Sequence, residues 1–494
     1  MVILSYEFAL CFLLFFVVYW ACRRSIQIQN YLLLGAGLLF VLSWQWQFLL
    51  SISYVWAIVQ VYIHFHNRLT QQSSKGTILI FAVSALALHL CFFKYTNFTI
   101  GELNRNLPDS SISPLDIVMP LGISFYTFQA ISYLVDIYRN KIKAVPASVT
   151  LAFLSFVPSI TAGPIVRMSD AIKFWQPRNY QNYLPAQDMT ESNVPQSMTR
   201  AERVAARQRH IILPYLAAAL IIFALFKKIV LASWLETLWV NPVFANPLQF
   251  HGLEVLTAVY AYSLQLFFDF SGYTDLAIAL ALLLGFRLPE NFNRPYLATD
   301  IQDFWNKWHM TLSTWIRDYI YIPLGGGRAS FWRVQINIML AFIISGVWHG
   351  AGWNFLIWGA IHGIALVFLN CMKKVGWRGW LTQKAKFLAV ILTFHYVAFG
   401  WIFFRSASFE QAVQVLQGLT QFDGVMVTLS LVPTLAMMLL AWLVYPYLGR
   451  SREQLANLLA KLPWWSLPVI FALYITLVFS LAPEGLPGFI YANF

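Results

Sequence analysis

The amino-acid sequence predicts an all-α polytopic membrane protein, and three observations support this fold class. Apolar residues make up 59% of the 494 residues and charged residues only 11%, whereas an average soluble domain carries about 25% charged residues. The mean hydropathy is +0.62, and apolar runs of membrane-spanning length recur along the chain. These observations exclude soluble multidomain enzymes and disordered chains. They favour one transmembrane domain over residues 1–494, surrounded by a lipid bilayer.

The placement of the basic residues indicates how the chain is oriented. The net charge is +12, which by itself would also fit a nucleic-acid-binding protein. However, the cations lie in short clusters beside apolar runs, as at Arg23 and Arg24 or at Lys373 and Lys374, and such clusters mark cytoplasmic loops. We therefore expect no nucleic-acid partner. The first apolar run ends at Arg23 and the last follows Arg450, so we expect both termini on the outer side.

Twelve apolar runs follow one another along the chain, and we expect about ten or eleven of them to be transmembrane helices. The first run, residues 6–21, has no basic region ahead of it and no cleavage site after it, so we interpret it as a retained helix. The other runs are residues 31–50, 53–64, 78–93, 118–138, 213–234, 255–284, 336–347, 355–371, 387–404, 425–447 and 465–481.

Four segments do not fit a simple span. Residues 149–165 carry Pro158, Gly163 and Pro164 between basic flanks, which predicts a re-entrant hairpin and a cavity nearby. Residues 167–210 are polar, and we expect a cytoplasmic loop there; for the last piece, residues 200–210, a cationic interfacial helix is the less favoured alternative. Residues 291–333 mix Trp, Arg and Asp, which predicts helices near the cytoplasmic face. The tail, residues 482–494, is expected to emerge outside.

Two segments place histidines where ionisable residues are costly and therefore suggest function. If residues 304–315 form one helix, Trp305, His309 and Ser313 share a face. In SGVWHGAGWNFLIWG, residues 345–359, His349 lies among glycines that permit close approach of backbone or ligand. The alternative, a histidine that packs and hydrogen-bonds between helices, stays open for both. No H-x-x-x-H or H-E-x-x-H pair occurs, so no metal site is predicted.

A third polar segment is residues 265–280, in which Asp269 and Tyr273 share a helical face and Asp275 lies near it. Pairing with a neighbouring helix is as plausible for these carboxylates as catalysis. The four cysteines show no C-x-x-C spacing and are interpreted as packing residues.

Seven blocks in the same order resemble the membrane-bound O-acyltransferase family, in particular its bacterial branch of peptidoglycan and alginate O-acetyltransferases and the lipoteichoic-acid D-alanyl transferase. The blocks are FFKYTNF (92–98), PLGISFYTFQAISYLVDIYR (120–139), AGPIVR (162–167), QLFFDFSGYTDLAIAL (265–280), ENFNRPY (290–296), the segment around Trp308 and His309, and GVWHGAGWNF (346–355).

The resemblance implies a ring of helices whose thin centre joins a cytoplasmic tunnel to an extracellular funnel. It implies that His349 is the catalytic histidine and that His309 is a second functional one. The residues expected to line the tunnel are Trp305, Trp308, Ser313, Trp348 and Trp353. The C-terminal FIYANF is similar to the F-I-Y-F-Q-F ending of this branch, which implies an acyl relay at Tyr491, although the chain departs from that ending at residues 492 and 493. An interfacial anchor is the alternative role for this tyrosine.

The function implied by the resemblance is O-acetylation of cell-envelope polysaccharide at a bacterial inner membrane. The acetyl donor would be cytoplasmic acetyl-CoA, with no metal, and the partner a periplasmic SGNH-type O-acetyltransferase. Peptidoglycan is the preferred acceptor, followed by alginate or another exopolysaccharide. From other classes, a transporter of lipid-linked sugars and a structural scaffold of an envelope complex remain alternatives.

Overall fold

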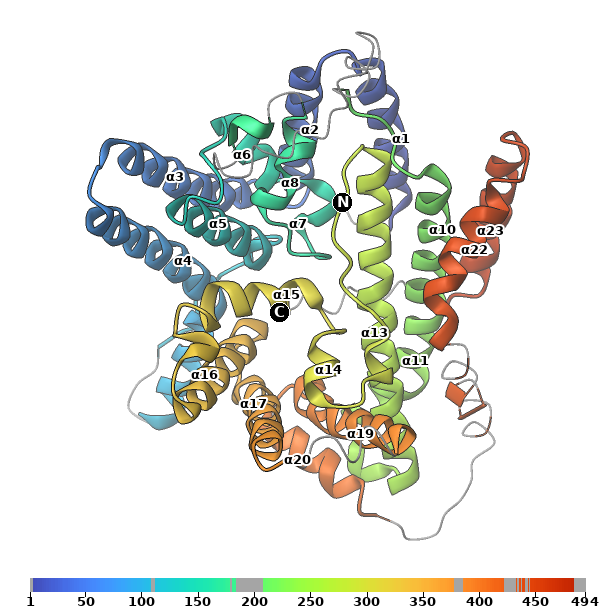
Figure 1. Cartoon of the computed structure of the whole chain (residues 1–494). Helices are drawn as coiled ribbons and strands as arrows, with labels where there is room; N and C mark the ends of the chain where they lie inside the picture. The colour runs from blue at the N-terminus through green and yellow to red at the C-terminus, as the bar shows by residue number, and fades with distance from the viewer. Residues whose placement is uncertain are drawn as a thin grey trace. The chain divides into compact units, whose positions relative to one another are not determined.

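The computed structural model describes residues 3–107, 112–177, 180–183, 208–376, 385–421 and 445–483, with isolated positions between 432 and 443. Within these ranges the regular structure is helical throughout, without strands (Figure 1). Seven of the described helices are long and apolar enough to span a bilayer, and three shorter helices are also apolar. The predicted all-α polytopic class is therefore confirmed. The predicted tail, with Tyr491, lies outside the described residues apart from its first two positions, and most of the polar 176–210 segment also lies outside.

The chain forms two compact units. The first contains Met1–Pro214 and Leu280–Pro289, and the second contains Tyr215–Ala279 and Glu290–Phe494. Each unit is held together by its own contacts. The ring around a tunnel stays a prediction.

In the first unit, apolar helices pack along their length. The helices are α1 (Tyr6–Ala21), α2 (Ile26–Leu42), α3 (Gln47–Arg68), α4 (Gln72–Asn106), α5 (Ile123–Tyr138), α6 (Ala147–Leu154), α7 (Val157–Ile160) and α8 (Met168–Trp175). Helices α3, α4 and α5 lie side by side (Figure 1). The predicted bounds of the first run are confirmed by α1. The predicted run 31–50 is wrong, because α2 ends at Leu42 and α3 begins at Gln47.

The irregular segment 149–165 is broken where its sequence contains proline and glycine. Helix α6 ends at Leu154 and α7 is a single turn. Gly122 has a φ of 71°, and a Cβ at this position would lie 1.9 Å from the carbonyl oxygen of Ile160. Only glycine therefore permits the approach of this segment to the start of α5. The break confirms that no continuous helix forms here, and the re-entrant path stays a prediction.

The second unit contains the remaining helices. A continuous helical stretch over Pro214–Ala245 comprises α10 (Pro214–Leu225), α11 (Ser233–Leu235), α12 (Asn241–Ala245) and π-helical turns at Phe226–Ala232 and Glu236–Val240. The others are α13 (Gly252–Leu283), α14 (Ile301–Trp305), α15 (Met310–Ile316), α16 (Phe331–His349), α17 (Trp353–Lys374), α19 (Lys386–Arg405), α20 (Phe409–Gly418), α22 (Leu448–Leu459) and α23 (Ser466–Ser480).

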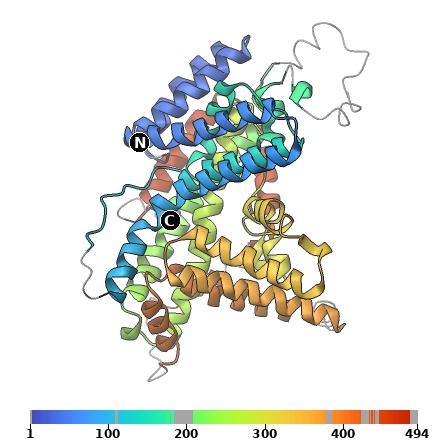
Figure 2. The same ribbon diagram turned by 90° about the vertical axis from the view of Figure 1, so that its left-hand side faces the viewer.

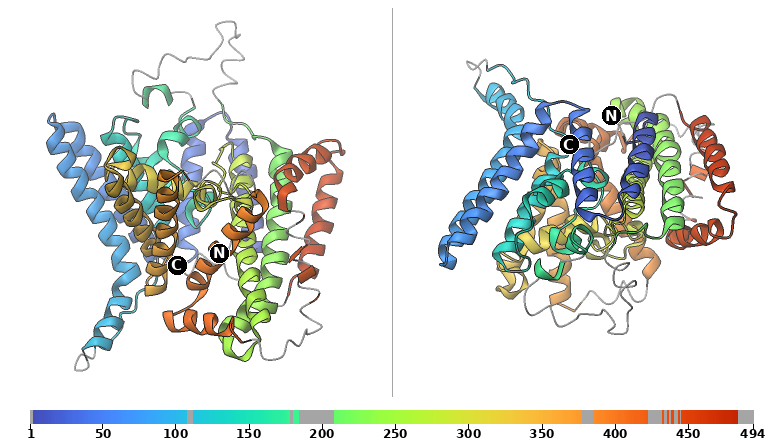
Figure 3. Two further views of the ribbon diagram at one scale, coloured as in Figure 1. Left: turned by 60° about the horizontal axis from the view of Figure 1, so that its bottom comes forward. Right: turned by 90° about the horizontal axis from the view of Figure 1, so that it is seen from above.

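Two packings organise this unit. Helices α22 and α23 lie beside α10 and its π-helical extension (Figure 3). Helices α16 and α17 lie side by side (Figure 2), because Gly346 and Gly359 let the two backbones touch. A Cβ on Gly346 would lie 2.3 Å from the carbonyl oxygen of Phe355, and one on Gly359 would lie 2.4 Å from that of Phe342. The glycines around the W-H-G block therefore serve close helix packing.

Candidate functional site

His349 is the last residue of α16, immediately before the short link to α17. Its side chain is 3% exposed. The imidazole contacts three rings, with centroid distances of 4.7 Å to Trp348, 5.0 Å to Trp358 and 5.1 Å to Phe404. His349 is therefore held in one orientation by aromatic packing at the α16–α17 corner.

His309 lies in a break between two helices, so the expectation of one helical face is wrong. Helix α14 ends at Trp305, His309 has a φ of 42°, and α15 begins at the next residue. The cause is Asn291, whose side-chain oxygen accepts hydrogen bonds from His309 Nδ1 (3.0 Å) and from the backbone N–H of Thr311 (3.2 Å). The backbone oxygen of Asn291 also accepts from the N–H of Met310. These hydrogen bonds to Asn291 stabilise the turn, and they replace the hydrogen bonds that a continuous helix would form here.

The bonds to Asn291 also fix the chemical character of His309. The backbone N–H of Thr311 donates to the side-chain oxygen of Asn291, so this oxygen is an acceptor. Nδ1 of His309 contacts the same oxygen, and it therefore carries the proton and donates. Nε2 is then a hydrogen-bond acceptor, and it has no partner among the described residues. Complete burial lowers the pKa of His309 to about 3, so the ring is neutral at physiological pH. A neutral ring in this tautomer accepts a proton or an N–H at Nε2, and it does not donate to a carbonyl there.

The rings of His309 and His349 both lie near the indole ring of Trp348. The ring of Trp348 lies 4.7 Å from that of His349 and 6.4 Å from that of His309. The prediction that these histidines belong to one site is therefore compatible with the geometry. Of the other predicted residues, Trp308 is buried in the aromatic core at 1% exposure, whereas Trp353 is 52% exposed.

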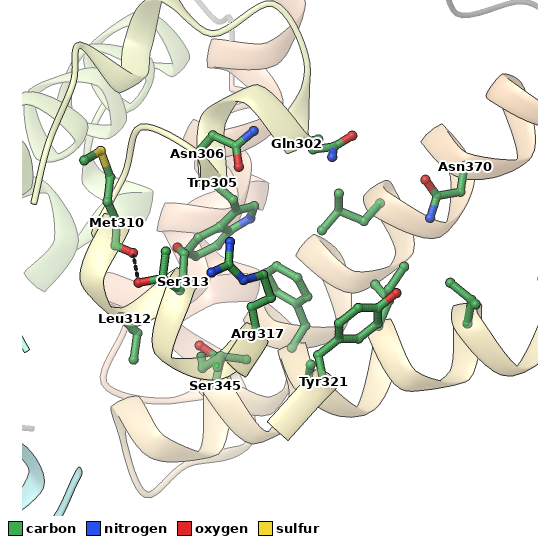
Figure 4. A pocket seen from close by; sticks show the side chains of 17 residues that line it. Gln302, Trp305, Asn306, Met310, Leu312, Ser313, Arg317, Tyr321, Ser345 and Asn370 are labelled. Atoms are coloured by element: carbon green, nitrogen blue, oxygen red, sulfur yellow. Dashed lines mark hydrogen bonds between the residues drawn. The ribbon is translucent and has the colours of Figure 1, made fainter. Parts of the chain in front are cut away.

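A cavity of about 580 Å³ lies between α14, α15, the π-helical turn Arg317–Tyr321, α16 and α17 (Figure 4), and neither His309 nor His349 is among its lining residues. Of the five residues expected to line a tunnel, Trp305 and Ser313 line this cavity, whereas Trp308, Trp348 and Trp353 do not. Ser345 also lines it. Ser345 precedes His349 by four residues, about one turn of α16.

The cavity wall is mostly apolar but carries several neutral hydrogen-bonding groups that the sequence pattern did not identify. They are Gln302, Asn306, Thr314, Ser345 and Asn370. The only available signal was spacing, since Ser345 is one turn before His349. Arg317 also lines the cavity and forms two hydrogen bonds to Asp318, at 2.7 and 3.2 Å. In the described part of the chain, no group of three or more His, Cys, Asp or Glu side chains is placed to hold a metal ion.

Comparison with known proteins places these residues in a family context. The sequence model described as MBOAT, membrane-bound O-acyltransferase family, matches residues 135–408, which include His309 and His349 but not Tyr491. A peptidoglycan O-acetyltransferase of Helicobacter pylori is 35% identical over 380 residues, 71% of this chain and 66% of that protein. The probable alginate O-acetylase AlgI of Pseudomonas aeruginosa is 32% identical over 401 residues, 80% of this chain and 70% of that protein. A teichoic acid D-alanyltransferase of Bacillus subtilis is 28% identical over 378 residues, 72% of this chain and 84% of that protein.

Proposed function

Because this chain belongs to the membrane-bound O-acyltransferase family and is a membrane-bound acyltransferase, we propose that it moves acetyl from cytoplasmic acetyl-CoA to cell-envelope polysaccharide. The site of action is a bacterial inner membrane, with both termini in the periplasm. Peptidoglycan is the first candidate acceptor, in keeping with the Helicobacter pylori relative. Alginate or another exopolysaccharide is the second, in keeping with the Pseudomonas aeruginosa relative.

The proposal rests on one observation, namely that the cavity is lined by residues close in sequence to both histidines. The cavity extends to Ser345, one turn from His349, and to Met310, the residue after His309. Its apolar wall with scattered amide and hydroxyl groups suits the pantetheine arm of acetyl-CoA, which has two amides on an aliphatic chain. Nε2 of His309 is an acceptor for an N–H of that arm. This supports a role for His309 in binding the pantetheine arm, and it argues against a role in polarising the thioester carbonyl.

In the proposed reaction His349 is the general base. An imidazole has an ordinary pKa near 6.5 and is suited to take a proton near neutral pH. It would remove the proton from the acceptor hydroxyl while the oxygen attacks the thioester carbonyl, and the thiolate of CoA would leave and take up a proton. Such base catalysis typically contributes about 10²- to 10⁴-fold in rate.

The proposed first acceptor is the phenol of Tyr491. A phenol has a pKa near 10 and is far more easily deprotonated than an aliphatic alcohol. The resulting aryl ester keeps much of the transfer potential of the thioester. A periplasmic SGNH-type O-acetyltransferase would take the acetyl group from this ester and place it on the polysaccharide.

The test is the release of free thiol from acetyl-CoA by the purified protein. We expect release by the native chain and a fall of at least about 100-fold in His349→Ala, the loss of a general base. His64→Ala is the control, because His64 lies on the exposed side of α3. Native rates in His349→Ala would remove this residue as the base.

Three further outcomes separate the alternatives. Normal acetylation of cell-wall sugar by Tyr491→Phe would return this tyrosine to an anchoring role. Flux of a lipid-linked sugar without consumption of acetyl-CoA would identify a transporter. Full tolerance of substitutions at both His309 and His349 would identify a structural scaffold.

A further inference from the structure

Behind the cavity wall lies a buried polar cluster that the proposed mechanism does not use. His362 on α17 is 0% exposed. Its ring lies 5.2 Å from that of Trp305, 4.9 Å from that of Trp358 and 6.1 Å from that of Trp401. We name these four residues the His362 cluster. All four are at most 7% exposed.

The nitrogen atoms of the His362 cluster lack protein partners. Both ring nitrogens of His362 and the indole nitrogens of the three tryptophans are buried and form no hydrogen bond with the described residues. A neutral imidazole offers one donor and one acceptor, and each indole offers one donor. Burying such atoms unpaired costs free energy, and native proteins usually satisfy them with protein groups or internal water. Five unpaired nitrogens in one cluster therefore point to a small polar ligand.

The backbone of the neighbouring helix packs closely against His362. Gly400 on α19 faces the imidazole, and a Cβ at this position would lie 3.0 Å from His362 Nε2 and 3.6 Å from Trp358 Cδ1. Because residue 400 has no side chain, no Cβ presses on Nε2 from α19. A buried water molecule is held by two or more polar partners, and the unpaired nitrogens of His362 and Trp358 supply them at this corner of the cluster.

The His362 cluster lies between the cavity and His349, so water bound there would lie between them as well. Trp305 lines the cavity, and Trp358 contacts His349 with a centroid distance of 5.0 Å. We propose that the His362 cluster binds internal water, and that this water forms the polar connection between the cavity and the surroundings of His349. The water-binding site stands independently of the reaction, whereas its use as a path to His349 rests on the proposed function.

Hydroxyl-radical footprinting of the purified full chain tests the site, because radicals formed from bound water oxidise the side chains next to it. In the native protein we expect Trp358 and Trp401 to be oxidised at least fivefold faster than Trp175, which is equally buried at 1% and belongs to the other unit. Equal rates for the three indoles would overturn the proposal without any variant.

Two variants then assign the water to its ligand. His362→Phe keeps a ring and removes both nitrogens, and Gly400→Ala places a methyl group 3.0 Å from Nε2 while every nitrogen stays. Both should lower the oxidation of Trp358 at least threefold. The matched control is His395→Phe, because His395 is exposed and both of its nitrogens already have partners, in Tyr260 and in the carbonyl of Ile391. Unchanged oxidation in both test variants would show that His362 does not hold the water.

Thiol release measured on the same samples separates this proposal from the proposed function. Loss of oxidation together with a tenfold slower release supports both the site and the path. Loss of oxidation with native release overturns the path to His349. An inactive native protein with strongly oxidised Trp358 would refute the proposed function and leave the water site standing.

Discussion

Lys227 and Asp275 form an ion pair inside the second unit, with 2.7 Å between the lysine Nζ and the carboxylate Oδ2. Both side chains are at most 3% exposed. Arg452 of α22 binds the other oxygen of the same carboxylate at 3.0 Å. The next residue, Lys228, pairs with Asp269, six residues before Asp275. The two carboxylates of the 265–280 block thus bind cations of neighbouring helices, which is the structural alternative that the sequence left open.

Removing Asp275 should therefore destabilise the protein more than removing Lys227. Asp275→Asn leaves the buried Lys227 and the partly buried Arg452 without their counter-charge, and we expect a loss of about 3–5 kcal/mol. Lys227→Met leaves the carboxylate paired with Arg452, so its cost should be smaller. The measurement is the unfolding midpoint of the detergent-solubilised protein. Arg317→Met is the control, because the Arg317 side chain is 58% exposed and such pairs contribute at most about 1 kcal/mol. Equal midpoints for both test variants would contradict the prediction.

In the first unit, the stability of the protein is expected to depend on Arg209. Its guanidinium is buried and donates to the carbonyl of Phe174, the hydroxyl of Tyr19 and the side-chain oxygen of Asn30. It also lies 4.6 Å from the ring of Phe286. A lysine cannot reproduce this fork of donors.

Arg209→Lys should therefore lower the stability by about 2–3 kcal/mol, since several acceptors lose charged hydrogen bonds. The unfolding midpoint in detergent measures the loss. Arg68→Lys, at the exposed end of α3, is the matched substitution. It should change the free energy of unfolding by at most about 0.5 kcal/mol. A midpoint unchanged in Arg209→Lys would show that the cation, and not its geometry, supports the fold.

Local sequence was sufficient for helices that are uniform apolar runs. The predicted runs 6–21, 255–284 and 387–404 agree closely with α1, α13 and α19, because length and hydropathy alone identify such helices. The run 31–50 failed because it contains a turn after Leu42 that is itself rich in tryptophan. The hydroxyl of Ser43 bonds back to the carbonyl of Phe40, a local competition with the helix that composition does not reveal.

The candidate site was predictable in part for the same reason. The glycines around His349 were expected to permit close approach of a backbone or a ligand, and Gly346 does let the backbones of α16 and α17 touch. The break at His309 was not predictable from periodicity, since its cause is Asn291, 18 residues earlier in the chain. Long-range hydrogen bonds override the 3.6-residue pattern, and no local window contains them. The same limit applies to His362, whose unpaired nitrogens become visible only when α14, α17 and α19 are seen together.

The cavity should be essential for donor binding, and Ser345 offers a direct way to block it. Ser345→Phe places a ring in the cavity one turn from His349, and we expect the rate of thiol release from acetyl-CoA to fall at least about tenfold, mainly through a higher KM. Ile344→Phe is the control, because Ile344 is the preceding residue on α16 and is 42% exposed. Native kinetics in Ser345→Phe would show that the donor binds elsewhere.

The buried histidine His309 should give the stability a specific pH dependence. Its pKa in the folded protein is about 3, whereas an unfolded histidine has a pKa near 6.5. Between these values the unfolded state binds one proton more than the folded state, so stability falls as the pH is lowered from about 6.5 towards 3. The loss from this one group is about 1.4 kcal/mol per pH unit. Above about pH 7 the group is neutral in both states and contributes no slope.

The measurement compares unfolding free energies of the native chain and His309→Asn in detergent at pH 7.5, 6 and 5. The substitution removes the titrating group, so the difference between the two proteins should change by about 2 kcal/mol over this range, with the variant gaining relative to the native chain as the pH falls. Met310→Leu, which alters the next residue without removing a titratable group, should follow the native curve. Parallel curves for the native chain and His309→Asn would mean that folding does not lower the pKa of His309, and hence that the ring is not held neutral in the folded protein.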